Sequence, residues 1–302
     1  MVNGRLLDGY IRRVQERNLP VDSIMVFQDG ERIAEHRWTP DVPHLIYSHT
    51  KSFTATAIGV AIDEGRLSLE DRVTDWFADE MPAGGYPMAD DLRLRHLLTM
   101  SSGRDVPLLM GGDRERLAEH DWVRYLLSKP ILTPPGTRFT YSNGDTYLAG
   151  VMLERAVGMT LADYAEDRLL KPMGIPRPVW EHCPMGHTFG ASGMWLRTAD
   201  MARLGLLYLQ NGEWNGRRLV SEKWIREASS RHIDTPDESV WRCGYGFQLW
   251  MNPIPESYRA DGLLGQFSHV LPDRRAVISM NNHAEDAFPI LDAMRDEIVP
   301  KL

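Results

Sequence analysis

The residues best suited to chemistry in this sequence are Ser48 and Lys51, which stand three positions apart. Residues at that spacing share one face of a helix, so the Lys51 amine is expected beside the Ser48 hydroxyl. A serine hydroxyl is a weak nucleophile until a base takes its proton, and a lysine with a depressed pKa can be that base. The spacing therefore indicates covalent catalysis, and an N-cap serine followed by a solvated lysine is the alternative interpretation.

Lysine is scarce in this chain, which adds weight to Lys51. Of 34 basic residues only five are lysines, at positions 51, 129, 171, 223 and 301, so the other 29 are arginines. Arginine is not deprotonated in proteins, so a general base has to be lysine. The small apolar segment that follows predicts a buried helix from about 48 to 64, which Gly65 ends. The start of that helix makes the Ser48 N–H a candidate oxyanion donor.

A second candidate group is Tyr141 with Asn143, in the stretch PPGTRFTYSNGD. A phenol near an ammonium group loses its proton more readily and can act as acid or base. An asparagine amide could orient the lysine or hold a substrate carbonyl. Taken alone, the same residues also fit a tyrosine packed in a loop and an asparagine at the start of the next helix.

The elements that must position these groups follow from hydrophobic periodicity and turn residues. The patterns at the two ends of the chain predict strands and terminal helices. Asp29-Gly30, near the start, predicts the turn of a hairpin. The middle reads as helices separated by Pro and Gly clusters. We predict an α/β domain from 1–67 and 200–302, with a largely antiparallel sheet, and a mainly helical domain over 68–199, with the cleft between them. Predicted helices are 4–18, 48–64, 92–99, 114–128, 143–157, 160–170, 199–211 (capped by Thr198) and 284–298, and predicted closing strands are YGFQLWMN, GQFSHVLP and RAVISMNN.

Composition narrows the class of partner. The 302 residues carry a formal charge of −8, which argues against nucleic acid as a partner because phosphate binding needs a basic face. No apolar run approaches the roughly 18 residues of a membrane span, and the first residues lack the apolar core of a secretion signal. Two cysteines, Cys183 and Cys243, cannot form a disulfide framework. We expect a cytoplasmic protein without a membrane partner, and its oligomeric state is left open.

Ser-x-x-Lys at a buried helix start, with Tyr-x-Asn 93 residues later, resembles the serine β-lactamase and penicillin-binding protein superfamily. The likeness is to class C β-lactamases, family VIII esterases and 6-aminohexanoate-dimer hydrolases, and it extends over about 45–302. It implies a β-lactamase/transpeptidase-like α/β (α+β) fold, with a five-stranded antiparallel sheet, terminal helices and a helical domain. By that resemblance Ser48 is the acylated nucleophile, Lys51 its base and Tyr141 the proton relay, and Asn143 assists binding. The loop that carries His187 would border the cleft and bring this residue to the substrate.

The third motif of the family, Lys-Thr-Gly or His-x-Gly on a strand edge, is absent from this sequence. The best alignment puts Leu263-Leu264-Gly265 there, so Gly265 would permit close approach and the Gln266 N–H would be the second oxyanion donor. A cation that grips a substrate carboxylate is lost, which weakens the β-lactamase and DD-peptidase interpretations. Arg259 could supply charge instead, but its direction is not set by the sequence.

The sequence therefore predicts a serine hydrolase that cleaves a small ester or amide through an acyl-enzyme, with no metal and no organic cofactor. The stretch from Glu181 to His187 offers too few ligands nearby for zinc, which needs three or four. Two alternatives stay open. One is a true β-lactamase or DD-peptidase, and the other is a non-catalytic ligand-binding module on the same scaffold.

Overall fold

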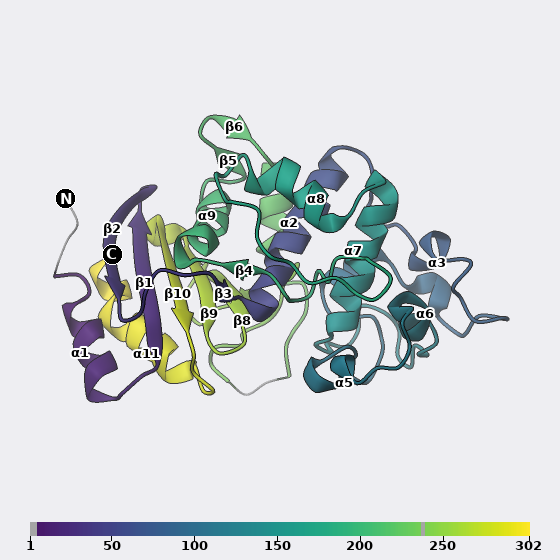
Figure 1. Cartoon of the computed structure of the whole chain (residues 1–302), viewed down its shortest axis with the longest axis horizontal. Coiled ribbons are helices and arrows are strands. Elements are labelled where there is room, and N and C mark those ends of the chain that lie inside the picture. Colours follow the sequence, from purple (N-terminus) through teal and green to yellow (C-terminus); the bar gives the residue numbers. More distant parts are fainter. Residues whose placement is uncertain (1–4, 237–238) are drawn as a thin grey trace.

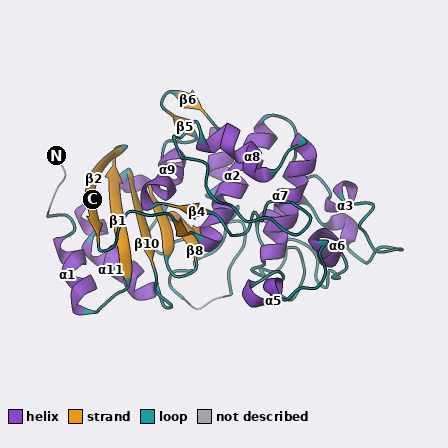
Figure 2. Cartoon of the chain, viewed as in Figure 1, coloured by secondary structure: helices purple, strands orange, loops and turns teal. Residues whose placement is uncertain are grey.

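A six-stranded antiparallel sheet forms one side of the molecule in the computed structural model, which describes residues 5–236 and 239–302 (Figures 1 and 2). Its strand order is β2-β1-β10-β9-β8-β7. The first two strands of the chain thus share one sheet with the last four, and β1 and β10 are the pair that joins the two groups. The strands are β1 Val21–Gln28, β2 Glu31–Arg37, β7 Trp250–Met251, β8 Tyr258–Gly262, β9 Gln266–Leu271 and β10 Ala276–Asn282.

The hairpin between β1 and β2 turns at Asp29 and Gly30, as predicted. Both residues have positive φ angles, 53° and 82°, which match the twist that a two-residue hairpin needs. One face of the sheet is covered by α1 (Asp8–Glu16) and α11 (Phe288–Glu297), whose apolar side chains form a buried cluster with β1 and β10. The other face packs against α9 (Thr198–Leu209), where Gly205 lets the helix approach Val277.

Two long helices, α2 (Thr50–Asp63) and α7 (Asn143–Val157), lie side by side in the helical part of the molecule (Figure 1). Twelve of the 14 residues of α2 are buried, so this helix is enclosed on every side. Shorter elements surround the pair: α3 Val73–Trp76, α4 Leu94–Leu98, α5 Gly111–Glu115, α6 Trp122–Leu127, α8 Leu161–Ala165 and the π-helix Glu166–Leu170. None of the helices in the described ranges has both the length and the apolar character to cross a bilayer.

Several predicted elements are corrected by the structure. The helix expected over 114–128 is two helices, because the Asp121 side chain caps α6 by accepting a hydrogen bond from the Arg124 N–H. The strand expected over YGFQLWMN is only β7, since Gln248 has a φ of 59° that breaks the extended chain. The N-cap of α9 is Arg197 and not Thr198. With β7 counted, the sheet has six strands rather than five.

Other short elements were not predicted at all. They are β3 His44–Leu45, β4 Trp195–Leu196, β5 Glu213–Trp214, β6 Arg217–Arg218, α10 Glu222–Ala228 and the 3₁₀ turns at Tyr47–His49, Ala89–Asp91, Pro272–Arg274 and Val299–Lys301. The strand β8 was also missed, and it is the one that borders the site. The predicted domain boundaries at 67 and 200 stay a prediction.

We expect Gly59→Ala to lower the free energy of unfolding by about 1–3 kcal/mol, because the added Cβ would lie 2.4 Å from the Trp224 ring in a packed interior. Gly150→Ala on α7 is the matched control, since its nearest neighbour is the Leu161 side chain at 3.3 Å. Urea denaturation of both variants measures the difference. Equal stability of the two variants would contradict the packing that the structure shows between α2 and α10.

Candidate active site

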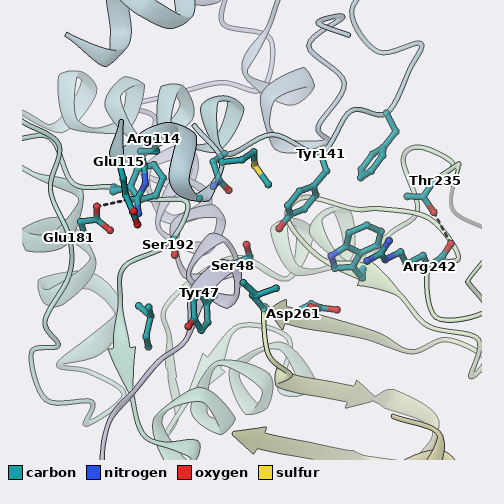
Figure 3. Close-up of a pocket in the computed structure, with 18 of the residues that line it drawn as sticks. Tyr47, Ser48, Arg114, Glu115, Tyr141, Glu181, Ser192, Thr235, Arg242 and Asp261 are labelled. Atoms are coloured by element: carbon teal, nitrogen blue, oxygen red, sulfur yellow. Dashed lines mark hydrogen bonds and ion pairs between the residues drawn. The ribbon is translucent and has the colours of Figure 1, made fainter. Parts of the chain in front are cut away.

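Ser48 is one of the residues that line a cavity of about 740 Å³ (Figure 3). It belongs to a 3₁₀ turn, Tyr47–His49, that continues directly into α2. Tyr47 has a φ of 46°, a left-handed conformation that is rare outside glycine and that turns the chain sharply into the helix. The first N–H groups of a helix have no intrahelical acceptor, so the turn presents backbone donors next to the half-buried Ser48 hydroxyl.

The Lys51 amine is buried, with 1% of the residue exposed, and lies beside three oxygens. Its Nζ is 2.9 Å from Ser48 Oγ, 2.7 Å from Asn143 Oδ1 and 2.8 Å from the Ala191 carbonyl oxygen. The amide and the carbonyl can only accept, so they take two N–H groups of the amine. The third contact is with a hydroxyl that can donate. The three contacts therefore suit either form of the amine: the ammonium donates to all three oxygens, and the neutral amine donates to two and accepts from the hydroxyl.

Burial is also the main influence on the protonation of Lys51. Desolvation holds the pKa of Lys51 well below its usual value, because the charged form loses its water. The carboxylate of Asp261 opposes this shift, and the guanidinium of Arg114 adds to it. The burial of the amine rules out the alternative of a solvated lysine, and the lowered pKa is the direction that a proton acceptor for Ser48 needs.

Asn143 is the first residue of α7, and both the oxygen and the nitrogen of its side-chain amide form hydrogen bonds. Its Oδ1 accepts from Lys51, and its Nδ2 donates to the Leu109 carbonyl oxygen at 2.9 Å. The second bond sets the orientation of the amide, so the oxygen faces the amine. The structure thus gives Asn143 a role in holding Lys51. Asn143 also lines the cavity, and its predicted part in substrate binding stays a prediction.

Tyr141 leans over the same pair of residues. The Lys51 Nζ lies 5.0 Å from the centroid of its ring, and the ring stacks on Trp250 with centroids 5.7 Å apart. Burial raises the pKa of Tyr141, and a hydrogen bond with Ser48 opposes that rise. The phenol therefore keeps its proton at neutral pH and is placed to exchange it with the serine oxygen.

The third strand motif lies three residues earlier than the sequence alignment put it. The strand edge that meets Ser48 is the end of β8, where a Cβ on Gly262 would lie 2.2 Å from the Ile46 carbonyl oxygen. The triplet at this edge is Ala260-Asp261-Gly262. Asp261 lines the cavity, and so does Leu263, the residue after the glycine. Glycines stand at both 262 and 265, so the sequence alone could not fix which one makes the close approach.

Three residues predicted to bind substrate lie elsewhere. Gly265 faces Asn282 and Ala287, and the buried Gln266 side chain donates to the Asn282 carbonyl oxygen. Neither lines the cavity. His187 is also absent from the lining, because its ring pairs with Glu154, a carboxylate of α7.

Arg259, whose direction the sequence left open, is fully buried and paired. Its Nε and Nη2 each lie 2.8 Å from Asp261 Oδ2, and its Nη1 donates to Asn252 Oδ1 and to the Trp241 carbonyl oxygen. It supports Asp261 from behind and does not reach into the cavity as a separate cation. Ala260 therefore stands at the lysine or histidine position of the family's motif, and Asp261 brings a fixed carboxylate to the middle position of the triplet.

Sequence reasoning missed four charged residues of the cavity lining, Arg114, Glu115, Arg242 and Asp261, and it weighed Glu181 only as a metal ligand. Arg114 and Glu181 form an ion pair across the cavity wall (Figure 3). No local pattern marks a pair of residues 67 positions apart, so the sequence held no signal for it. The acid of Ala260-Asp261-Gly262 would have been found by testing both glycines as the motif's third residue.

The comparisons with known proteins agree with this geometry. The β-lactamase family model matches residues 7–294. A Salmonella agona protein named for a conjectured D-alanyl-D-alanine carboxypeptidase activity is 20% identical over 364 aligned positions, which cover 94% of this chain and 84% of that protein. The D-aminopeptidase of Brucella anthropi is 29% identical over 192 positions, which cover 57% of this chain and 35% of that protein.

Solved structures show the same fold. EstCE1, described as a hydrolase with promiscuous acyltransferase activity, superposes with a TM-score of 0.77 at 16% identity. The match covers 98% of both chains. At this level of identity the likeness bears on the fold alone, and it confirms the expected β-lactamase/transpeptidase-like architecture.

We expect Lys51→Arg to reduce kcat/KM for ester substrates by about 10³-fold or more, because a guanidinium cannot take the serine proton. Lys223→Arg, at an exposed lysine, is the matched control and should leave the rate unchanged. Steady-state kinetics with a p-nitrophenyl ester measure both. Activity of Lys51→Arg within tenfold of the parent would rule out Lys51 as the base.

Asp261→Asn should move the acidic limb of the pH–rate profile to lower pH. The Asp261 charge raises the pKa of Lys51, so its removal lowers that pKa, and the neutral amine then forms at lower pH. The control is Asp273→Asn, in the exposed turn at the far end of β9. A profile of kcat/KM against pH tests this, and a limb that stays in place or moves up would contradict it.

Proposed function

Because the chain belongs to the β-lactamase family and is a serine hydrolase, we propose that it cleaves a small ester or amide through an acyl-enzyme on Ser48. The observation that carries the proposal is the buried Lys51 amine, 2.9 Å from the Ser48 oxygen and held by two acceptor oxygens. A solvated or ion-paired lysine could not act as a base at neutral pH.

In the acylation step, Ser48 Oγ attacks the substrate carbonyl carbon while its proton passes to Lys51 Nζ. The carbonyl oxygen becomes an oxyanion, and we assign its two donors to the N–H groups of Ser48 and Leu263. Leu263 replaces Gln266 in this role, since it follows the glycine that makes the close approach to the turn before α2.

Collapse of the tetrahedral intermediate breaks the bond between the carbonyl carbon and the leaving group. The departing oxygen or nitrogen takes a proton from Tyr141, and the proton that Lys51 received from Ser48 then passes to Tyr141 and replaces it. Water then attacks the acyl-enzyme by the same route in reverse and gives up a proton to the Lys51–Tyr141 pair. The carboxylic acid leaves, and Ser48 regains its proton. Every proton is moved by the chain's own side chains.

The substrate class follows from the charge at the end of β8. Ala260 stands at the position of the lysine or histidine that would grip a substrate carboxylate, so the end of β8 offers no cation there. Asp261 adds a carboxylate to the cavity lining, paired with Arg259 behind it. This favours neutral esters or amides over β-lactams and acyl-D-Ala-D-Ala peptides. We expect weak or no turnover of nitrocefin, and efficient nitrocefin turnover would overturn this part of the proposal.

We expect an alkyl fluorophosphonate to add one phosphonyl group to the protein, as measured by intact mass. Ser48→Ala should give no adduct and should lose p-nitrophenyl ester hydrolysis by several orders of magnitude. Ser192→Ala, which removes another hydroxyl of the same cavity, is the control that should still be labelled. An adduct on Ser48→Ala, or no adduct on the parent protein, would contradict the acyl-enzyme.

A further inference from the structure

Tyr141 fixes the direction in which a substrate lies in the cavity. The leaving group must reach the phenol that protonates it, so the acyl group must extend to the other side of Ser48. Figure 3 shows Tyr141 on one side of Ser48, and Arg114 with Glu181 on the opposite side. The end of the cavity that holds these two residues is therefore the acyl end.

An ion pair between two side chains lines the acyl end of the cavity. Arg114 comes from α5 and Glu181 from the loop before β4, and their side chains are joined in an ion pair across the cavity. The Arg114 guanidinium also covers the Phe189 ring, with its Cζ 4.4 Å from the centroid. Only 14% of the Arg114 side chain is exposed, whereas 38% of the Glu181 side chain is, so the arginine is the buried partner of the pair.

The backbone around Glu181 is held by more hydrogen bonds to neighbouring segments than the short helix that carries Arg114. Glu181 is anchored by its backbone, which donates to the Gly193 carbonyl oxygen at 3.1 Å and accepts from the Phe189 N–H at 2.8 Å. In contrast, α5 buries none of its five residues. The Arg114 side chain is thus the main tie between α5 and the opposite wall, and its loss should open that end of the cavity.

We propose that the Arg114–Glu181 pair limits the length of the acyl group, so that the enzyme prefers short acyl chains. This inference rests on the proposed function, because it needs the acyl group to be carried by Ser48. The pair forms the far wall of the acyl end, and a chain that extends past it must break the ion pair.

The test is a series of p-nitrophenyl esters from acetyl to octanoyl, which vary the acyl group and keep the leaving group fixed. The parent protein should lose kcat/KM as the chain grows. Arg114→Ala should raise the octanoyl-to-acetyl ratio about tenfold, since each methylene that the opened end buries is worth about fourfold. Glu181→Gln, which keeps the shape of the side chain and removes its charge, should shift the ratio in the same direction by less.

The matched control is Arg116→Ala, which removes an exposed arginine of the same segment that pairs with Asp113. It should leave the acyl-chain profile unchanged. Thermal unfolding of each variant establishes that it is folded. The profile from Arg114→Lys, which retains a charge for Glu181, should lie closest to the parent.

Two results would overturn the inference. One is an acyl-chain profile of Arg114→Ala that matches the parent. The other is an equal loss on every ester, which would make Arg114 a residue that positions the catalytic groups. Ser48→Ala, run on the same series, separates this from the proposed function: hydrolysis by that variant at the parent rate contradicts the acyl-enzyme, whatever the profile of the Arg114 variants.

Discussion

The whole site depends on keeping one amine out of water. Lys51 is buried where its charged form is costly, and that cost lowers the pKa of its amine. Three segments far apart in the chain supply the hydrogen-bond partners that the buried amine needs. These are the turn before α2, the first residue of α7 and the carbonyl of Ala191. Each brings one oxygen, and the amine is satisfied only when all three are in place.

The rest of the architecture can be understood as support for that contact. Enclosure of α2 keeps Lys51 dry, and the close approach at Gly262 brings the end of β8 against the turn that carries Ser48. Behind this edge the buried Arg259 holds Asp261 in a fixed position. Asp261 therefore has two effects. It opposes the fall in the pKa of Lys51, and it places a carboxylate in the lining of the cavity.

Local sequence predicted much of this and missed what depends on distant contacts. The helix over 143–157 has the predicted bounds, and the grouping of Ser48, Lys51 and Tyr141 is as expected from their spacing and family resemblance. The strand register at the third motif was wrong by three residues, since two glycines fit the pattern equally well. His187 was wrongly brought to the cavity, because its partner Glu154 lies 33 positions away and no periodicity reports such a pairing.

The most direct test of the account is the pKa of Lys51 in the folded protein. With only five lysines, protein labelled with ¹³C at the lysine ε-carbon should give five NMR signals, and the Lys51→Arg variant identifies the one that belongs to Lys51. We expect that signal to titrate well below the other four, with the amine largely neutral at the pH where the enzyme works. If all five signals titrate together near the ordinary lysine value of about 10.4, the amine is charged and the central claim is wrong.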